Sequence, residues 1–440
     1  MPNKKITLIG AGLAGPLMAS YLVKQGFLVE IYERRPDMRK IKIPAGRSIN
    51  LALSARGILA LKEVGIFDKI KSYIIPMSGR MIHDKSGLTN FQSYGQRHNE
   101  VIYSISRSKL NSDLMSFAES TGRISIYFNH KLVNINLDKK ELEFEKKKVP
   151  FKKVFGCDGS GSILRDAIVE KTKTKFIQKP LGHGYKELNI PPSKSNKYQI
   201  DHDVLHIWPR GNFMMIALPN MDKSFTVTLF MSLKGKISFE TIKTPKQIKD
   251  FFKTYFIDTL KLMPNLIKDF KENPVGSLTS NYCGQWHYKD NAVIFGDAAH
   301  AIVPFFGQGM NASFQDCVVL NRLINKHSGD WNKIFKNFSF EHVKNGHAIA
   351  DMALENYVEM RDAVNDPLYL ERRELELSLE KKFPNRFIPR YSMVSFHQIP
   401  YSQVYKRGEI QFKLMSDFLS KKIPQRDLYK NIENSLKPIV

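Results

Sequence analysis

The stretch KITLIGAGLAG, which runs from Lys5 to Gly15, decides the fold class of this 440-residue chain. Its apolar segment predicts a strand, and Gly10, Gly12 and Gly15 follow in G-x-G-x-x-G spacing. The glycines let the backbone turn tightly and approach a pyrophosphate, whose negative charge is then faced by the amides of the next helix. The stretch therefore predicts a dinucleotide-binding turn, provided that a helix and a second strand follow it.

The residues after this turn supply both elements. A helical pattern runs from Leu13 to Gln25, Gly26 ends it, and FLVEIYE forms a second predicted strand that ends at Glu33. Glu33 lies 18 residues after Gly15, close to the roughly 20 at which an acid meets the ribose of a bound dinucleotide. The glycines and Glu33 thus predict a cofactor site, although this unit alone does not distinguish NAD from FAD.

A second turn with an acidic residue lies in KKVFGCDGSGSILRDAI, where a predicted strand ends at Phe155. Asp158, Ser162 and Arg165 follow in the pattern DGxxSxxR, the last two at the start of a predicted helix. An Asp-Gly pair alone indicates only a turn. The longer pattern resembles a motif of flavin-dependent aromatic hydroxylases, and the resemblance implies that Asp158 and Arg165 serve the FAD pyrophosphate and the nicotinamide donor.

A third turn lies in FGDAAHAIVPFFGQGMNASFQD, where Asp297 ends an apolar run. A glycine-rich helix start follows at Gly309, Met310 and Asn311. In the same superfamily the acid contacts the ribityl chain of the flavin, and the helix start lies under the isoalloxazine ring. Backbone amides at a helix start can bind the pyrimidine carbonyl and favour the negative charge of the reduced ring.

Together these motifs predict an α/β fold with a discontinuous, Rossmann-like FAD-binding domain of the GR2 type. We expect this domain to comprise residues 1–75, 97–180 and 283–330. A sheet-rich substrate domain is expected at 76–96 and 181–282, where SFTVTLFMSL predicts a strand. A C-terminal helical domain is expected at 331–440.

Nearly the whole chain resembles the kynurenine 3-monooxygenase family, through motifs beyond those that bind FAD. These motifs are YERRPD (32–37), GRSINLALS (46–54), HGYKEL (183–188), LHIWPRG (205–211), ALENYVEM (353–360) and RFIPRYSMV (386–394). The resemblance implies that NADPH and dioxygen hydroxylate L-kynurenine to 3-hydroxykynurenine through a flavin C4a-hydroperoxide, in tryptophan degradation and NAD biosynthesis. It implies no covalent catalytic residue and no metal.

The resemblance also assigns site residues by position. The substrate contacts are Arg80, Tyr94, Asn356 and Tyr391. The non-covalent FAD contacts are Glu33, Arg34, Ala52, Arg107, Leu132, Asp297, Met310 and Asn311. An arginine fork can bind the α-carboxylate of kynurenine, and a tyrosine hydroxyl can add a donor.

Taken by themselves, the four substrate residues have plainer readings. Arg80 follows a glycine and reads as a surface arginine, and Tyr94 reads as an exposed or half-buried aromatic. Asn356 reads as an amide on a helix face, and Tyr391 as a strand or loop residue. His300 is read as a structural histidine in a strand-to-helix loop, because nothing nearby in the sequence would orient it.

Two features depart from the family. Some relatives carry a histidine where this chain has Phe306, and relatives from complex cells continue into an apolar membrane segment where this chain has KKIPQRDLYKNIENSLKPIV. We therefore expect a cytoplasmic enzyme of bacterial type without a membrane anchor, as a monomer or homodimer. Three cysteines separated by 126 and 34 residues favour free thiols in a reducing compartment.

Several other functions stay open at this point. The net charge of +24 suggests nucleic acid, but the lysines are scattered without interleaved aromatics, so we expect small-molecule partners and no nucleic acid. A flavin-dependent halogenase would carry a Trp-x-Trp-x-Ile element, whereas Trp208, Trp286 and Trp331 stand alone. A hydroxylase of another aromatic compound, a flavin reductase or dehydrogenase, and a non-catalytic flavin-binding or RNA-binding protein remain alternatives.

Overall fold

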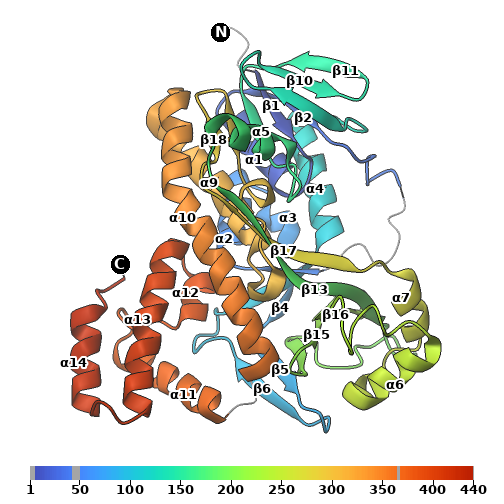
Figure 1. Ribbon diagram of the computed structural model, residues 1–440, viewed down its shortest axis with the longest axis vertical. Coiled ribbons are helices and arrows are strands. Elements are labelled where there is room, and N and C mark those ends of the chain that lie inside the picture. The colour runs from blue at the N-terminus through green and yellow to red at the C-terminus, as the bar shows by residue number, and fades with distance from the viewer. Residues whose placement is uncertain (1–4, 42–49, 364–366, 440) are drawn as a thin grey trace. The chain divides into compact units, whose positions relative to one another are not determined.

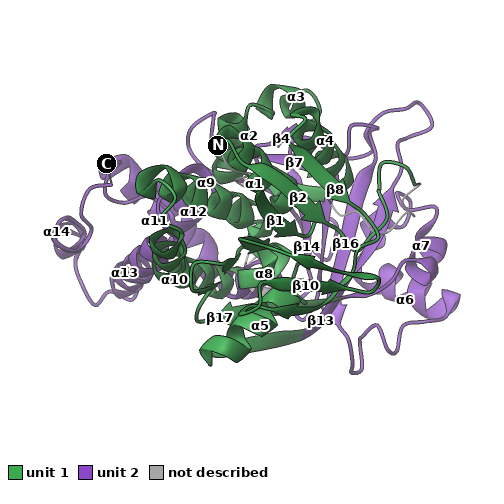
Figure 2. Cartoon of the chain, turned by 90° about the horizontal axis from the view of Figure 1, so that it is seen from above, with its two compact units in different colours: residues 1–74, 105–181, 277–353 green, residues 75–104, 182–276, 354–440 purple. Residues whose placement is uncertain are grey.

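Chain segments far apart in sequence assemble into two units in the computed structural model, which describes residues 5–41, 50–363 and 367–439 (Figure 1). Unit 1 comprises residues 1–74, 105–181 and 277–353, and unit 2 comprises 75–104, 182–276 and 354–440 (Figure 2). The first four residues of the GRSINLALS motif lie outside the described residues. No helix in the described part of the chain has the length and apolar character that crossing a bilayer requires.

A six-stranded sheet with the order β18-β19-β12-β1-β2-β8 forms the centre of unit 1. All neighbours pair in parallel except β18 and β19, which are antiparallel. The strands are β1 (Lys5–Ile9), β2 (Leu28–Tyr32), β8 (Ile124–Tyr127), β12 (Val154–Gly156), β18 (His287–Tyr288) and β19 (Ala292–Ile294). Because the carboxyl ends of parallel strands share one edge, the turns after β1, β12 and β19 converge there.

The remaining elements of unit 1 are mostly helices. The predicted helix from Leu13 to Gln25 is confirmed as α1, which packs against α4 and α9. The helices are α1 (Ala14–Lys24), α2 (Ala55–Val64), α3 (Phe67–Lys71), α4 (Arg107–Ser120), α5 (Ile163–Thr172), α8 (Asp297–His300), η2 (Pro304–Phe306) and α9 (Gly309–His327). The other strands are β3 (Asn50–Leu53) and the antiparallel sheet β11-β10-β9, built from β9 (Leu132–Asn136), β10 (Glu141–Phe144) and β11 (Lys147–Pro150).

A seven-stranded sheet has the order β17-β13-β16-β15-β14-β5-β6, and its strands β16, β15, β14, β5 and β6 lie wholly in unit 2. The predicted strand in SFTVTLFMSL is confirmed as β16, which is buried along nearly its whole length. The strands of this unit are β4 (Ile75–Met77), β5 (Gly79–His83), β6 (Thr89–Ser93), β14 (Leu205–Pro209), β15 (Met214–Pro219) and β16 (Phe225–Ser232). Four elements run through the sequence boundaries of the units: β7 (Ile102–Ser106), β13 (Phe176–Ile190), β17 (Gly276–Cys283) and α10 (Trp331–Val358).

Two apolar cores stabilise unit 2. In the first, Phe251 and Phe252 of α6 (Pro245–Tyr255) and Phe270 of α7 (Leu266–Glu272) pack with the apolar side chains of the sheet. The second core joins α11 (Pro367–Lys382), α13 (Tyr401–Leu419) and α14 (Gln425–Ser435). The short elements are η1 (Ile257–Thr259), the π-helical turn η3 (Glu359–Ala363) and α12 (Arg390–Phe396).

Candidate functional site

The glycine turn after β1 has the geometry that a dinucleotide site requires. Gly10 has φ +105° and its N–H donates to the Tyr32 carbonyl at 2.8 Å. A side-chain carbon at Gly15 would lie 2.1 Å from the Gly10 oxygen, so this position is restricted to glycine. A carbon added at Gly12 would meet no protein atom within 4 Å. The turn is therefore closed on its protein side and open at Gly12, where a ligand can approach the backbone.

Glu33 lies directly after β2 and connects the glycine turn to the next loop. Its Oε2 accepts from the Ala11 N–H at 2.8 Å, and its Oε1 accepts from the Arg35 N–H and Nε at 2.9 and 2.8 Å. Burial raises the pKa of Glu33, but the hydrogen bonds from Arg35 and Ala11 outweigh burial and lower it overall. Arg34, which the resemblance assigns to FAD, is exposed. Arg35 is the arginine that pairs with Glu33, and the Arg34-Arg35 doublet gives no signal in the sequence of which one does so.

Asp297 is the exposed residue in a run that is otherwise buried from Asn291 to Ala301. The turn before it is held by Asp316, whose Oδ2 accepts from the Gly296 N–H at 2.8 Å. The Asp297 carboxylate therefore lies at the surface of an otherwise apolar turn. There it can accept hydrogen bonds from the hydroxyls of a polyol.

Asp316 also pairs with two buried histidines. His300 Nε2 lies 2.6 Å from Asp316 Oδ2, and His342 Nδ1 lies 3.2 Å from Asp316 Oδ1. Burial lowers the pKa of His300, but Asp316 reverses the effect and raises it overall. The structural role expected for His300 fits this pairing, although the residue ends the short helix α8 and does not lie in a loop. The residue that orients it, Asp316, lies 16 residues later in the chain.

The start of α9 is held by the side chain of Asn311. Its Oδ1 accepts from the Ser54 N–H at 3.0 Å, and its Nδ2 donates to the carbonyls of Ala52 and Gly307, each at 2.8 Å. Asn311 is 0% exposed, and its side chain fixes the backbone at the helix start. The first N–H groups of a helix have no partner inside the helix, which leaves this helix start able to bind a carbonyl.

The DGxxSxxR motif forms a network within its own loop. Asp158 accepts from the Ser162 hydroxyl at 2.6 Å and from the Ile163 N–H at 2.9 Å. Burial raises the pKa of Asp158, and the Ser162 hydrogen bond opposes this. Arg165 is 3% exposed, donates to the Ser160 carbonyl at 2.6 Å and pairs with Asp166. Both predicted residues therefore shape the loop and the start of α5.

Two further predicted cofactor residues lie at element starts. Arg107 is the exposed first residue of α4, and Leu132 is the buried first residue of β9. All the predicted cofactor residues belong to unit 1. The open space at Gly12 and the exposed Asp297 carboxylate fit a ligand that combines a pyrophosphate with a polyol, as FAD does.

The predicted substrate residues lie in unit 2, where Arg80 contacts two tyrosines. The rings of Tyr94 and Tyr391 stack at 4.9 Å with an interplanar angle of 8°. The Arg80 guanidinium carbon lies 4.8 Å from the centre of the Tyr391 ring and 5.7 Å from that of Tyr94. Arg80 is 7% exposed and Tyr94 is 2% exposed, so the readings of a surface arginine and an exposed or half-buried tyrosine were wrong. Tyr391 lies in helix α12, not in a strand or loop.

Sequence reasoning missed two residues beside Arg80. Glu359 Oε1 lies 3.8 Å from Arg80 Nη1 and accepts from the Tyr369 hydroxyl at 3.0 Å. Burial lowers the pKa of Arg80, but the surrounding tyrosines and Glu359 reverse the effect and raise it overall. The signal for Glu359 was its position three residues after Asn356, which puts both on one face of a helix.

The remaining donors of this cluster are buried. Burial raises the pKa of Tyr94 and, separately, that of Tyr391, so both hydroxyls stay protonated. The Tyr94 hydroxyl has no hydrogen-bond partner within the described ranges of the chain. Asn356 is 4% exposed and its Nδ2 lies 3.2 Å from Met360 Sδ. A buried cation with a distant acid and one tyrosine hydroxyl beside it can bind an anion.

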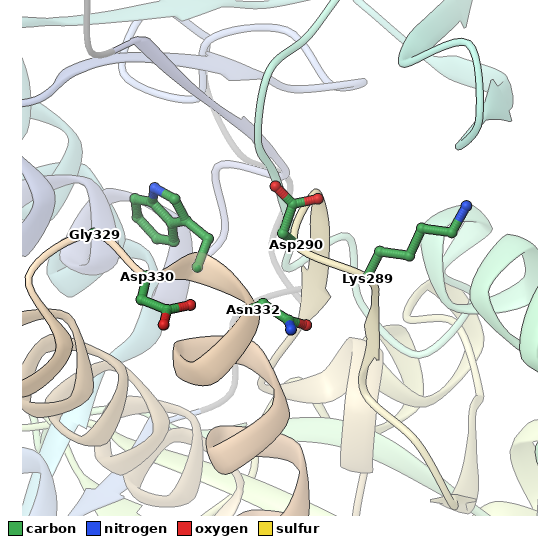
Figure 3. Close-up of a pocket in the computed structure, with 6 residues that line it drawn as sticks. Lys289, Asp290, Gly329, Asp330 and Asn332 are labelled. Atoms are coloured by element: carbon green, nitrogen blue, oxygen red, sulfur yellow. The ribbon is translucent and has the colours of Figure 1, made fainter.

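A surface pocket of about 560 Å³ lies elsewhere in unit 1 (Figure 3). It is lined by Lys289 and Asp290, from the turn between β18 and β19, and by residues 329–332 at the start of α10. Every predicted site residue is among the described residues, and none of them lines this pocket. The pocket therefore shares no residue with the predicted cofactor and substrate sites.

Known proteins resemble this chain over nearly its whole length. A family model described as an FAD binding domain matches residues 4–332. A kynurenine 3-monooxygenase of Myxococcus xanthus is 43% identical over 428 residues, which span 96% of this chain and 92% of the relative. Kynurenine 3-monooxygenases of Anopheles gambiae and Dictyostelium discoideum are 42% and 41% identical, over 94% and 95% of this chain and 86% and 93% of theirs.

Solved structures share the fold. The tetrameric form of 2-methyl-3-hydroxypyridine-5-carboxylic acid oxygenase has a TM-score of 0.67 at 17% identity, over 84% of this chain and 96% of that chain. A variant of HpxO from Klebsiella pneumoniae, complexed with FAD, has a TM-score of 0.68 at 16% identity, over 87% and 97%. These likenesses confirm the predicted fold class, an α/β FAD-binding hydroxylase fold with C-terminal helices.

Proposed function

We propose, from the premise that this chain belongs to the kynurenine 3-monooxygenase family, that its Arg80 cluster binds the amino-acid end of L-kynurenine. The chain is an FAD-dependent monooxygenase that hydroxylates L-kynurenine to 3-hydroxykynurenine with NADPH and dioxygen. The proposal assigns particular residues to each part of this reaction.

Arg80 binds the α-carboxylate in this proposal. The observation that carries it is a buried guanidinium whose acidic neighbour, Glu359, lies 3.8 Å away, beyond ordinary hydrogen-bond distance. A carboxylate can therefore form the two parallel bonds that an arginine fork favours. The Tyr94 hydroxyl adds a third donor, and the stacked Tyr94 and Tyr391 rings hold the guanidinium plane in place.

Glu359 binds the α-ammonium group. Kynurenine carries its two charged groups on one carbon, so the group that binds the ammonium must lie next to the group that binds the carboxylate. Glu359 meets this requirement, and the Tyr369 hydroxyl fixes its Oε1 at 3.0 Å. Asn356, one helical turn before Glu359, lies on the same helix face and can contact the rest of the substrate.

The cofactor contacts proposed in unit 1 differ in the part of FAD that each one binds. The turn formed by Gly10, Gly12 and Gly15 binds the pyrophosphate, and Glu33 accepts from the ribose with the lone pairs that Arg35 and Ala11 leave free. Asp297 accepts from the ribityl hydroxyls. The first amides of α9, at Gly309, Met310 and Asn311, bind the pyrimidine carbonyl. Further contacts are proposed at Arg34, Ala52, Arg107, Leu132, Asp158 and Arg165.

Bound FAD supplies the redox chemistry, which uses electrons from NADPH to activate dioxygen. The protein binds and orients the substrate, and it keeps water from the reacting groups. Arg80 and Glu359 bind only the amino-acid end, so the neutral, electron-rich aminobenzoyl ring is left free for hydroxylation. No side chain needs to form a covalent bond in this scheme.

Two substrate analogues test the assignment. Kynuramine lacks the α-carboxylate, and 4-(2-aminophenyl)-4-oxobutanoic acid lacks the α-ammonium. Loss of a charge-assisted pair costs about 2 kcal/mol, so kynuramine should bind at least about thirtyfold more weakly than L-kynurenine. 4-(2-Aminophenyl)-4-oxobutanoic acid should also bind the parent protein more weakly than L-kynurenine does. The Glu359→Gln variant should bind these two compounds with equal affinity. Equal affinity for kynuramine and L-kynurenine would remove Arg80 from the site.

We further propose that the protein works in the cytoplasm as a monomer or homodimer. Cys157, Cys283 and Cys317 are free thiols, as a reducing compartment allows. Fractionation of cells followed by light scattering of the purified protein would test both statements. Recovery with the membrane fraction, or a larger assembly, would contradict them.

A further inference from the structure

A buried chain of hydrogen bonds lies at the end of β5, the strand that carries Arg80. His83 Nε2 lies 2.8 Å from His206 Nδ1, and His83 Nδ1 lies 3.1 Å from Asp258 Oδ2. The Trp208 indole N–H donates to the same Asp258 oxygen at 2.7 Å. His206 and Trp208 belong to the LHIWPRG motif, which the cofactor and substrate sites do not use.

The acceptors in this chain fix its protons. His206 Nε2 lies 2.7 Å from the Asp201 carbonyl, which can only accept, so this nitrogen carries the proton. Burial lowers the pKa of His206 to about 4, so at neutral pH its Nδ1 is an acceptor. Burial raises the pKa of Asp258, but hydrogen bonds from His83 and Trp208 outweigh burial and keep it ionised. His83 Nε2 therefore donates to His206 Nδ1, and His83 Nδ1 faces the Asp258 carboxylate.

The neighbours of His83 complete the arrangement. The Trp208 ring stacks on the His83 ring at 4.1 Å. Arg210 donates to the carbonyls of His83 and Asp84, each at 2.9 Å, and so holds the backbone at the end of β5. The charged groups that face His83 and His206 are thus Asp258, Arg210 and Asp84, with Asp203 near His206. Both ring nitrogens of His83 therefore have a hydrogen-bond partner.

The register of β5 decides where Arg80 points. Strands β5 and β6 form a hairpin, which joins the rest of the sheet through a parallel ladder between β5 and β14. This ladder has three paired positions, which are Arg80 with Leu205, Met81 with His206 and Ile82 with Ile207. A slip of one residue would move every side chain of the strand to the opposite face. Successive side chains alternate, so Arg80 and His83 lie on opposite faces and do not compete for space.

We propose that His83, His206 and Asp258 form a positioning device that fixes the register of β5 on β14 and thereby holds Arg80 in the substrate cluster. The inference rests on the proposed function, because it requires that Arg80 binds the substrate. These residues act through Arg80 and need not touch the substrate themselves.

The test compares substrate affinity in variants of the FAD-loaded protein. His206→Ala should weaken L-kynurenine binding by about tenfold and leave the FAD content unchanged. A tenfold loss lies within the range of interaction energies between residues of one hydrogen-bond network. Trp208→Phe removes a single hydrogen bond and keeps the ring stack, so it should give a smaller loss of about threefold. This milder variant serves if His206→Ala does not fold.

Lys186→Met provides the matched control. Lys186 is a buried cation of the same sheet that donates to the carbonyls of Phe270 and Asn273 at 2.7 and 2.6 Å, away from β5. The Lys186→Met substitution should lower the melting temperature of the protein and leave the dissociation constant of L-kynurenine unchanged. If Trp208→Phe and His206→Ala behave in the same way as this control, the positioning role is wrong.

A double variant separates this inference from the proposed function. In an Arg80→Gln background, His206→Ala should cause no further loss of affinity, because its effect passes through Arg80. Additive losses would overturn the positioning role and leave the Arg80 assignment intact. If Arg80→Gln alone leaves affinity unchanged, both the proposed site and this inference are refuted.

Discussion

Replacing Arg80 by glutamine should separate substrate binding from cofactor binding. Arg80 is 7% exposed and its acidic neighbour Glu359 is 3.8 Å away, so the fork is available to a carboxylate. Losing one charge-assisted interaction costs about 2 kcal/mol, which corresponds to roughly thirtyfold in affinity. Glu359 would then face the substrate carboxylate without a cation between them, which adds to the loss. We therefore expect the dissociation constant of L-kynurenine to rise at least about thirtyfold.

The assay is a titration of the FAD-loaded variant with L-kynurenine, followed by the change in flavin absorbance. Arg80→Lys should give an intermediate loss, because it keeps the charge but not the planar fork. Arg97→Gln makes the same chemical change in unit 2, at an arginine whose side chain is 50% exposed, and should have no effect. A dissociation constant for Arg80→Gln within twofold of the parent would refute the reasoning, provided that FAD content is equal.

Three further predictions concern the cofactor site and the effect of pH. Asp297→Ala should purify with little FAD if its exposed carboxylate accepts from the ribityl chain as proposed. Full yellow occupancy would show this assignment to be wrong. Gly12→Ala should fold normally, because its added carbon meets no protein atom within 4 Å, but it should bind FAD weakly. Circular dichroism would report on folding, and the flavin content would report on FAD binding. Burial lowers the pKa of His206 from 6.5 to about 4. Between these two pH values the unfolded state binds more protons than the folded state. The free energy of unfolding should therefore fall as the pH falls from about 6.5 to about 4. His206→Asn should reduce that dependence in denaturant titrations, and an unchanged slope would contradict the neutral buried state.

The sequence predicted the local parts of the fold well. The first strand, the helix after the glycines and the strand before Glu33 each depend on a short pattern, and β1, α1 and β2 confirm them. The pairing of β12 and β19 beside β1 depends on contacts between segments more than a hundred residues apart. No short pattern encodes such pairing, so only the motifs at the strand ends pointed to it.

The candidate site was predictable only where a motif carries its own mechanism. The glycine spacing and Glu33 are of this kind, and the turn geometry agrees with them. Arg80 is different, because it is buried by Tyr94 and Tyr391 from other segments, and its own neighbours indicated a surface residue. The Glu359 side chain lacked any signal except its helical spacing from Asn356.

The most direct test of the central claim is product analysis under isotopically labelled dioxygen. FAD-loaded protein with NADPH and L-kynurenine should yield 3-hydroxykynurenine that contains one labelled oxygen atom, and NADPH loss should accelerate when kynurenine is added. The Arg80→Gln variant should need far more substrate for the same product. NADPH oxidation without labelled product at any kynurenine concentration, or a protein that cannot be loaded with FAD, would contradict the account.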